Sequence, residues 1–235
     1  FLSDLQLGNI PDPGGLLDDE VTNLKLVFNY DVLQESSKIL HQGLVAYVSG
    51  NFEQGNDFGQ DDNFDILISD YTLLTFMNIP YVDVDTRLIL RSSIQYTDSA
   101  LASVSQIFLG GPTRARGYPV NQFSADSAFY VGVDWIFNMP SWLNIKFSNI
   151  YSLRDFAQPF LFADAAYGVK NAFQDGESNS EATLYDAGIG FRVFYLNYLQ
   201  GNLQFAYPIS SSFTDELLAT PSDSVRIVFD IQYGF

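Results

Sequence analysis

Apolar and polar side chains alternate one by one along the last eleven residues of the chain. One face carries Val225, Ile227, Phe229, Ile231, Tyr233 and Phe235, and the other carries Arg226, Val228, Asp230, Gln232 and Gly234. Because successive side chains of a strand point to opposite faces, the pattern predicts a β-strand with one apolar face. Its length is also about what a tilted strand needs to cross a bilayer.

The same alternation recurs upstream. It predicts further strands over 24–31, 42–52, 64–77, 86–97, 126–138, 158–169, 184–196 and 200–209, and residues 1–9 are a candidate tenth strand. The register of 64–77 is the least regular, because Asp70 falls on what would be the apolar face. The chain is therefore predicted to be all-β.

Composition favours one of two kinds of all-β protein. A soluble sandwich also shows alternation, but aromatic residues make up 16% of this chain and charged residues only 17%, against about 25% on average. Aromatic residues fall near strand ends, as at Tyr30, Tyr96 and Tyr195, where a membrane interface would place them. The opposite faces carry Arg, Asp, Gln and Gly, which suit a wet interior. We therefore expect a transmembrane antiparallel β-barrel, and no membrane-spanning helix, because no run of about 18 apolar residues occurs.

Long and short connections alternate along the chain. Stretches 11–21, 53–63, 170–183 and 210–223 are long and acidic, whereas 139–141 and 197–200 are candidate short turns. Long loops outside the cell and short periplasmic turns are typical of outer-membrane barrels. Strand directions alternate correctly if 142–156 is a periplasmic connection rather than a spanning strand. The acidic loops predict a solvated, repelling surface, or else a surface where Ca²⁺ or Mg²⁺ bridges to lipid; we favour the first, since no loop has EF-hand spacing.

Several functional classes are excluded or disfavoured by composition. The formal net charge of −17 argues against a nucleic-acid partner. The chain has no Cys and one His, His41, which leaves little material for a metal site or a catalytic triad. Asp83 and Asp85 are similar to a phosphatase nucleophile pair but lack the strand-to-helix context. We expect no catalytic residues, no metal and no cofactor.

The segment 97–125 is unusual for an exposed loop. Its centre is rich in glycine and arginine, with Gly110, Gly111, Arg114, Arg116, Gly117 and Tyr118. Glycine permits a tight backbone and close approach, and an arginine buried in a lumen needs a carboxylate partner. We expect this loop to fold back into the barrel.

These residues resemble a known family. The elements are Gln95, Leu101, Phe108, the Leu-Gly-Gly of 109–111, the Arg-Gly-Tyr of 116–118, the Ser-Ala-Asp of 124–126, the Pro-Phe-Leu-Phe-Ala-Asp-Ala of 159–165 and the Gly-Ile-Gly-Phe-Arg of 188–192. Their order and spacing are similar to those of two-partner secretion transporters of the haemolysin-activator type, within the barrel-assembly superfamily. Ala115 stands where the family usually has Val.

The resemblance implies a sixteen-stranded barrel of the bacterial outer membrane, preceded by two periplasmic POTRA domains that this chain lacks. Residues 1–235 would then be its C-terminal nine or ten strands, with Tyr233 and Phe235 forming the signal for the barrel-assembly machinery. The resemblance also implies that Arg116 pairs with Asp164 across the lumen. Alternation independently places Asp164 on the inward face, and places Asp134 and Asp186 inward on neighbouring strands, where they could share the arginine.

The expected function is a protein-conducting pore that exports an unfolded partner protein without cofactor, surrounded by outer-membrane lipids and lipopolysaccharide. The main alternative is an assembly factor, or insertase, of the same superfamily, which shares the Arg-Gly-aromatic loop. A small-solute porin and a self-contained ten-stranded structural barrel are less favoured functions.

Overall fold

The computed structural model describes residues 20–53, 63–81, 84–140, 145–146, 152–172, 176–195, 199–215 and 224–234. Its large sheet contains β1 (Glu20–Gln34), β2 (Ile39–Glu53), β3 (Asn63–Ile79), β4 (Val84–Tyr96), β7 (Ser127–Phe137), β8 (Ala157–Lys170), β9 (Ser180–Tyr195), β10 (Leu199–Phe213) and β11 (Arg226–Tyr233). The other elements are short: β5 (Ile107–Leu109), β6 (Phe123–Ala125), a 3₁₀ turn at Ser103–Ser105 and α1 (Leu153–Phe156). Among the described residues, no helix has the length and apolar character needed to span a bilayer.

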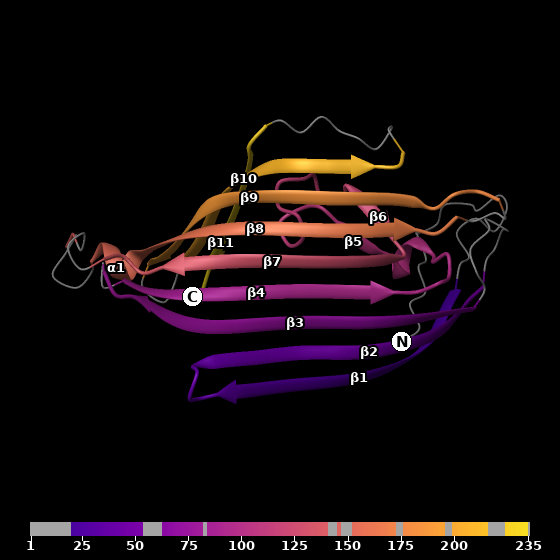
Figure 1. The fold of residues 1–235 in the computed structure, drawn as a ribbon, viewed down its shortest axis with the longest axis horizontal. Helices are drawn as coiled ribbons and strands as arrows, with labels where there is room; N and C mark the ends of the chain where they lie inside the picture. The colour runs from indigo at the N-terminus through magenta and orange to yellow at the C-terminus, as the bar shows by residue number, and fades with distance from the viewer. Residues whose placement is uncertain are drawn as a thin grey trace.

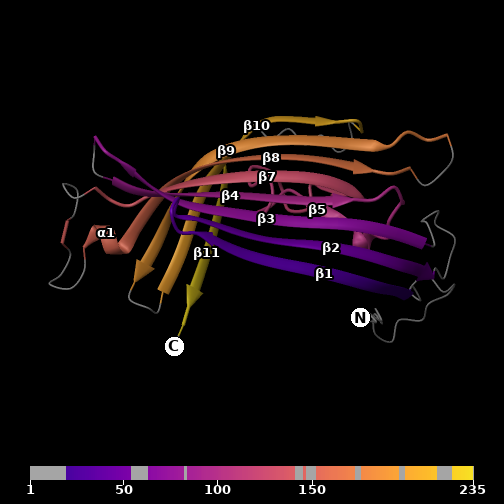
Figure 2. The ribbon, with the colours of Figure 1, turned by 60° about the horizontal axis from the view of Figure 1, so that its bottom comes forward.

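The nine long strands form one antiparallel sheet. Its order is β1-β2-β3-β4-β7-β8-β9-β10-β11, so each strand pairs with the next long strand in the chain. The all-β prediction is confirmed. The sheet is curved (Figures 1 and 2), but it is open, since no described strand joins β1 to β11. The candidate tenth strand at 1–9 lies outside the described residues.

The two faces of the sheet differ as the alternation predicts. In β8, Phe162, Asp164 and Ala166 are buried, whereas Leu161 and Tyr167 are exposed. We call the face that carries Asp164 the inner face and the opposite one the outer face. The outer face is apolar and exposed along most strands, and the loop between β4 and β7 covers part of the inner face, over β2, β3, β7, β8 and β9.

The connections lie at two ends of the sheet. The strands that precede the short intervals in the chain, β1, β3 and β9, finish at the same end of the sheet as β11. The strands that precede the longer intervals, β2, β4, β8 and β10, finish at the opposite end, which we call the end with the long connections (Figure 1). The connection 138–156 contains α1, and β7 pairs directly with β8, so no described part of this segment inserts a strand between them. The predicted connection at 142–156 is confirmed to that extent, while 141–144 and 147–151 are outside the described residues.

Several strands extend further than the sequence predicts. β1 begins at Glu20, β9 begins at Ser180 and β10 continues to Phe213, so parts of the expected loops 11–21, 170–183 and 210–223 belong to strands. Polar residues continue these strands because the ladder is made by backbone groups and does not need apolar side chains.

Asp70 lies on the inner face of β3, in an unbroken register with β2 and β4. Its carboxylate accepts a hydrogen bond from the Ser93 hydroxyl at 2.6 Å. Phe64 and Ile66 lie on the same face, buried in a cluster with Leu101 of the loop. The irregular pattern therefore arises because the inner face of this strand is apolar beneath the loop and is interrupted further along by Asp70 and Thr72.

Candidate functional site

The loop between β4 and β7 folds back as a hairpin on the inner face. Within it, β5 pairs with β6 over three residues on each side. Leu109, Tyr118 and Phe123 of the hairpin are buried in one cluster with inner-face residues of β7, β8 and β9, which are Ala128, Tyr130, Ala166, Ala182 and Leu184. The sequence predicts the inward fold of this loop but not its internal β-hairpin.

Two glycines shape the tip of the hairpin. Gly110 and Gly111 have φ angles of 94° and 99°, which favour glycine. Their N–H groups donate to the carbonyl oxygens of Arg114 (2.8 Å) and Tyr118 (3.1 Å). A Cβ atom on Gly110 would lie 2.2 Å from the Pro119 carbonyl oxygen. The tip is therefore a folded unit that presents Arg116 in a fixed direction.

Arg116 and Asp164 form a two-point ion pair. The guanidinium donates from Nε to Asp164 Oδ2 at 2.7 Å and from Nη2 to Asp164 Oδ1 at 2.8 Å. Nη2 also lies 2.8 Å from Oδ1 of Asp134, and the Arg116 backbone N–H donates to Asp164 Oδ2 at 3.2 Å. Arg116 is only 3% exposed. We call Arg116, Asp164 and Asp134 the arginine latch, because they join the loop tip to β7 and β8.

Neighbouring residues fit closely around the latch. The Tyr130 hydroxyl donates to Asp164 Oδ1 at 3.0 Å. The Phe162 ring lies under the guanidinium, with its centroid 3.8 Å from Cζ of Arg116, a cation–π contact. Phe162 has room because its cross-strand partner is Gly188, where a Cβ atom would lie 2.5 Å from the ring.

The latch carboxylates keep Arg116 charged. Burial alone would lower the pKa of the Arg116 guanidinium, but the hydrogen bonds and negative charge of Asp164 and Asp134 outweigh that effect and raise the pKa above its ordinary value. The contact is therefore a buried ion pair. Removing one member of such a pair leaves an uncompensated charge and is costly.

Asp134 also joins the latch to two further strands. Its Oδ2 accepts from Arg91 of β4 at 2.8 Å and lies 3.4 Å from Nη2 of Arg192 of β9. The alternation places both arginines on the inner face, but it does not reveal that they share one carboxylate with Arg116. Asp134 of β7 thus connects the loop tip to β4 and β9 as well.

Asp186 behaves differently from the other two candidate carboxylates. It is buried on the inner face and lies directly across from Asp164 in the β8–β9 register. Among the described residues, no ion pair joins Asp186 to Arg116. Asp164 and Asp134 make the ion pairs with Arg116, and a share of Asp186 in holding the arginine stays a prediction. Gly117 packs against Asp186: a Cβ on this glycine would lie 2.7 Å from Cβ of Asp186.

Tyr118 makes a second attachment of the loop tip. Its hydroxyl lies 2.6 Å from the carbonyl oxygen of Ser210 and 3.0 Å from that of Tyr185. The β9–β10 register shifts between Pro208 and Ser210, and such an irregularity frees backbone groups from the ladder. Tyr118 therefore holds the tip on β9 and β10, through backbone atoms that carry no sequence signature.

Asp126 fixes the root of the loop. It is fully buried and accepts from the N–H of Asn171 (2.7 Å), Nε2 of Gln106 (2.9 Å) and the N–H of Leu101 (3.1 Å). Gln95 Nε2 donates to the backbone oxygens of Ser105 and Asp126, each at 3.0 Å. Burial raises the pKa of the Asp126 carboxyl, and these donors oppose the rise. The sequence does not reveal this role, and the place of Asp126 at the end of the Ser-Ala-Asp of 124–126 is the one available signal of it.

The remaining candidate residues lie away from the latch. Tyr233 ends β11 and is exposed on the outer face, and Phe235 lies outside the described residues. His41 Nδ1 lies 2.8 Å from the Tyr71 hydroxyl, on β2 and β3 rather than beneath the loop tip. Among the described residues, no group of three or more His, Cys, Asp or Glu side chains could hold a metal ion.

Comparison with models of known protein families gives no match, and no curated protein matches the sequence.

Proposed function

We propose that this chain is part of an outer-membrane β-barrel that exports an unfolded partner protein, with the loop 97–126 latched against the inner wall. The observation that carries the proposal is the buried contact of Arg116 with Asp164 and Asp134. A charged pair of this kind, on a face that also carries Arg91, Arg192 and Asp186, suits the wall of a polar lumen better than the interior of a soluble domain.

The outer face supports a membrane location. Exposed apolar side chains cover it, among them Phe129, Leu161 and Ile189, which are 44%, 46% and 47% exposed. Large exposed apolar surfaces are rare on soluble monomers. Tyrosines gather toward the end with the long connections, at Tyr47, Tyr96, Tyr167, Tyr185 and Tyr207, and Trp135 and Phe137 pack together toward the opposite end. Two aromatic girdles around an apolar band are typical of outer-membrane barrels.

The open sheet supports a larger barrel. Unpaired backbone groups along β1 and β11 would be very costly in a bilayer, so a chain that spans one needs both edges paired, with each other or with further strands. We propose that these strands belong to the same longer protein and complete a sixteen-stranded barrel. The intact mass of the protein extracted from its native membrane tests this point: we expect a value far above 26.3 kDa, and a value near it would overturn the sixteen-stranded proposal.

Export would need no cofactor in this proposal. An unfolded chain would pass along the polar inner wall, and its folding outside the cell would give the process direction. The latch would hold the loop in the one position from which export can start, so that the pore is not freely open at rest and transport needs the latch.

Depletion of the full-length protein from its native host tests the function. We expect one or a few proteins to disappear from the culture medium, while the amounts of other outer-membrane barrels stay unchanged. A general fall in outer-membrane barrels would favour the insertase instead, which would use the same latch. No change in either fraction would overturn both roles.

A further inference from the structure

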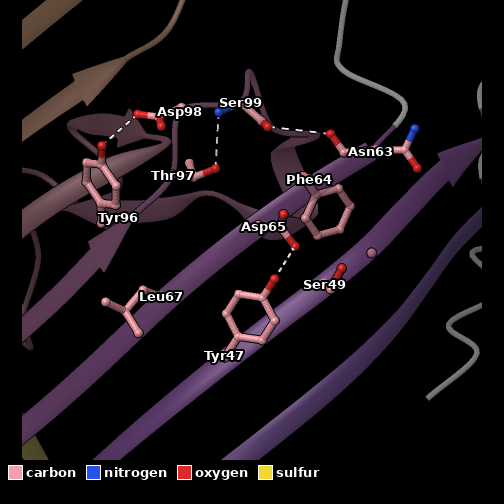
Figure 3. A pocket seen from close by; sticks show the side chains of 11 residues that line it. Tyr47, Ser49, Asn63, Phe64, Asp65, Leu67, Tyr96, Thr97, Asp98 and Ser99 are labelled. Atoms are coloured by element: carbon pink, nitrogen blue, oxygen red, sulfur yellow. Dashed lines mark hydrogen bonds between the residues drawn. The ribbon is translucent and has the colours of Figure 1, made fainter.

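A hollow of about 370 Å³ lies on the outer face near the long connections. Figure 3 shows it between the ends of β2 and β3 and the start of the loop, with Tyr47, Asp65, Leu67, Tyr96 and Asp98 in its lining. Its volume falls in the range of about 300–1,000 Å³ that small-ligand sites occupy. Neither the latch nor the proposed export path uses it.

Two rows of residues define the position of this hollow. Tyr47, Leu67 and Tyr96 lie side by side on three neighbouring strands, because Leu67 pairs with both tyrosines in the register. The next row toward the long connections is polar, with Ser49 paired to Asp65. The hollow thus lies where the apolar outer face ends, at the level of lipid headgroups if the sheet spans a membrane.

The lining presents hydrogen-bond acceptors beside aromatic rings. The Tyr47 hydroxyl donates to Oδ1 of Asp65 and the Tyr96 hydroxyl donates to Oδ1 of Asp98, each at 2.7 Å (Figure 3). Each contact orients a carboxylate that has further acceptor positions. Tyr47 and Tyr96 are 45% and 55% exposed, so their apolar ring surface is open to a ligand.

The charge of the lining selects the kind of ligand. Among the described residues, the lining contains two aspartates and no lysine or arginine, so a phosphate or carboxylate would be repelled. A ligand that fits must supply hydrogen-bond donors and an apolar face for the rings. A sugar ring has both, because its hydroxyls donate and its C–H faces are apolar.

We propose that this hollow binds a sugar ring of a glycolipid in the outer leaflet. The proposal rests on the proposed membrane location of the sheet and adds a lipid partner to it. The site adjoins the loop root: the Ser99 carbonyl accepts from Asn171 Nδ2 at 2.9 Å, and the Thr97 N–H donates to Ser127 Oγ at 2.9 Å. Asn171 also donates to Asp126. A bound sugar would therefore contact the segment from which the latched loop begins.

Photo-crosslinking in the native outer membrane tests this site. The full-length protein carries p-benzoylphenylalanine in place of Leu67, or in place of Tyr207 as a control on the outer face of β10. After irradiation, crosslinked lipopolysaccharide is detected by its core sugars. We expect a strong product at position 67, and about a tenfold loss in the Asp65→Asn variant, because one acceptor of a charge-assisted hydrogen bond is replaced by a donor. The control position should give a weaker product that Asp65→Asn does not change.

Three outcomes would overturn the sugar site. Equal products at both positions, unaffected by Asp65→Asn, would mean contact with bulk lipid only. Loss of the product at position 67 on chelation of divalent cations, while the control product remains, would mean that the carboxylates bind a cation rather than a sugar. Absence of a product at position 67, in a protein that fractionates with the outer membrane, would reject the site while leaving the proposed export function intact. Heat-dependent migration on gels confirms that each variant has assembled.

Discussion

Replacing Arg116 with Met removes the charged member of the latch that belongs to the loop and keeps a side chain of similar length. The substitution deletes two side-chain hydrogen bonds to Asp164 and the ion pair with Asp134. Breaking a buried ion pair costs about 3–5 kcal/mol, which corresponds to a shift of about 100- to 4,000-fold in the docking equilibrium of the loop. In the variant, Asp134 retains its ion pair with Arg91, and Asp164 retains the hydrogen bond from the Tyr130 hydroxyl. We therefore expect the docking equilibrium to shift by about 100-fold, at the lower end of this range.

A single cysteine reports the position of the loop. The chain contains no Cys, and Ala166 is buried beneath the hairpin, so Ala166→Cys reacts with a maleimide only when the loop lifts away. Under rapid opening and closing, the labelling rate follows the open population. We expect labelling in membranes of the full-length protein to accelerate by about 100-fold in Arg116→Met.

Arg114 provides the matched control for this measurement. It lies on the same loop, but its side-chain hydrogen bond to the Ser93 hydroxyl is long, at 3.4 Å. Arg114→Met should change the labelling rate by less than about threefold, as for other weakly held surface residues. If the two variants accelerate labelling equally, the latch does not hold the loop, and our reasoning about Asp164 is refuted.

Three further variants test other contacts. Tyr118→Phe removes the hydroxyl that bridges β9 and β10 and should accelerate labelling at position 166 by about fivefold to tenfold, from a loss of about 1–1.5 kcal/mol; no acceleration would show that this attachment is dispensable. Gly188→Val should prevent assembly, because a Cβ would lie 2.1 Å from the Phe205 carbonyl oxygen. The control Gly201→Ala, whose Cβ has no neighbour closer than 3.8 Å, should assemble normally. Heat-dependent gel migration measures assembly of both variants. Asp126→Ala removes the acceptor for three donors at the loop root and should make the loop sensitive to protease at its base; resistance equal to that of the unchanged protein would contradict this role.

The sequence predicts the sheet and the direction of its side chains well. Alternation in 158–169 places Asp164 inward and Leu161 outward, and both positions agree with the structure. Period-two patterning works here because one face of each strand meets the loop and the other remains apolar and exposed.

Other features have no periodic signature. β5 and β6 are three residues long, which is too short for alternation to be recognised. Tyr118 binds only backbone carbonyl oxygens, and two of the three donors to Asp126 are backbone N–H groups, so most of these contacts have no partner side chain for the sequence to reveal. The choice of Asp134 over Asp186 as a partner of Arg116 depends on side-chain geometry within one inner face, which alternation cannot resolve.

The most direct test of the arginine latch is secretion by an Arg116→Ala variant of the full-length protein in its native host. The extracellular partner identified by depletion is measured in the medium, together with barrel assembly by heat-dependent gel migration, and Arg114→Ala serves as the control. We predict that Arg116→Ala assembles but no longer exports the partner, while Arg114→Ala exports it normally. Normal export by an assembled Arg116→Ala protein would contradict the claim that the latch is needed for transport.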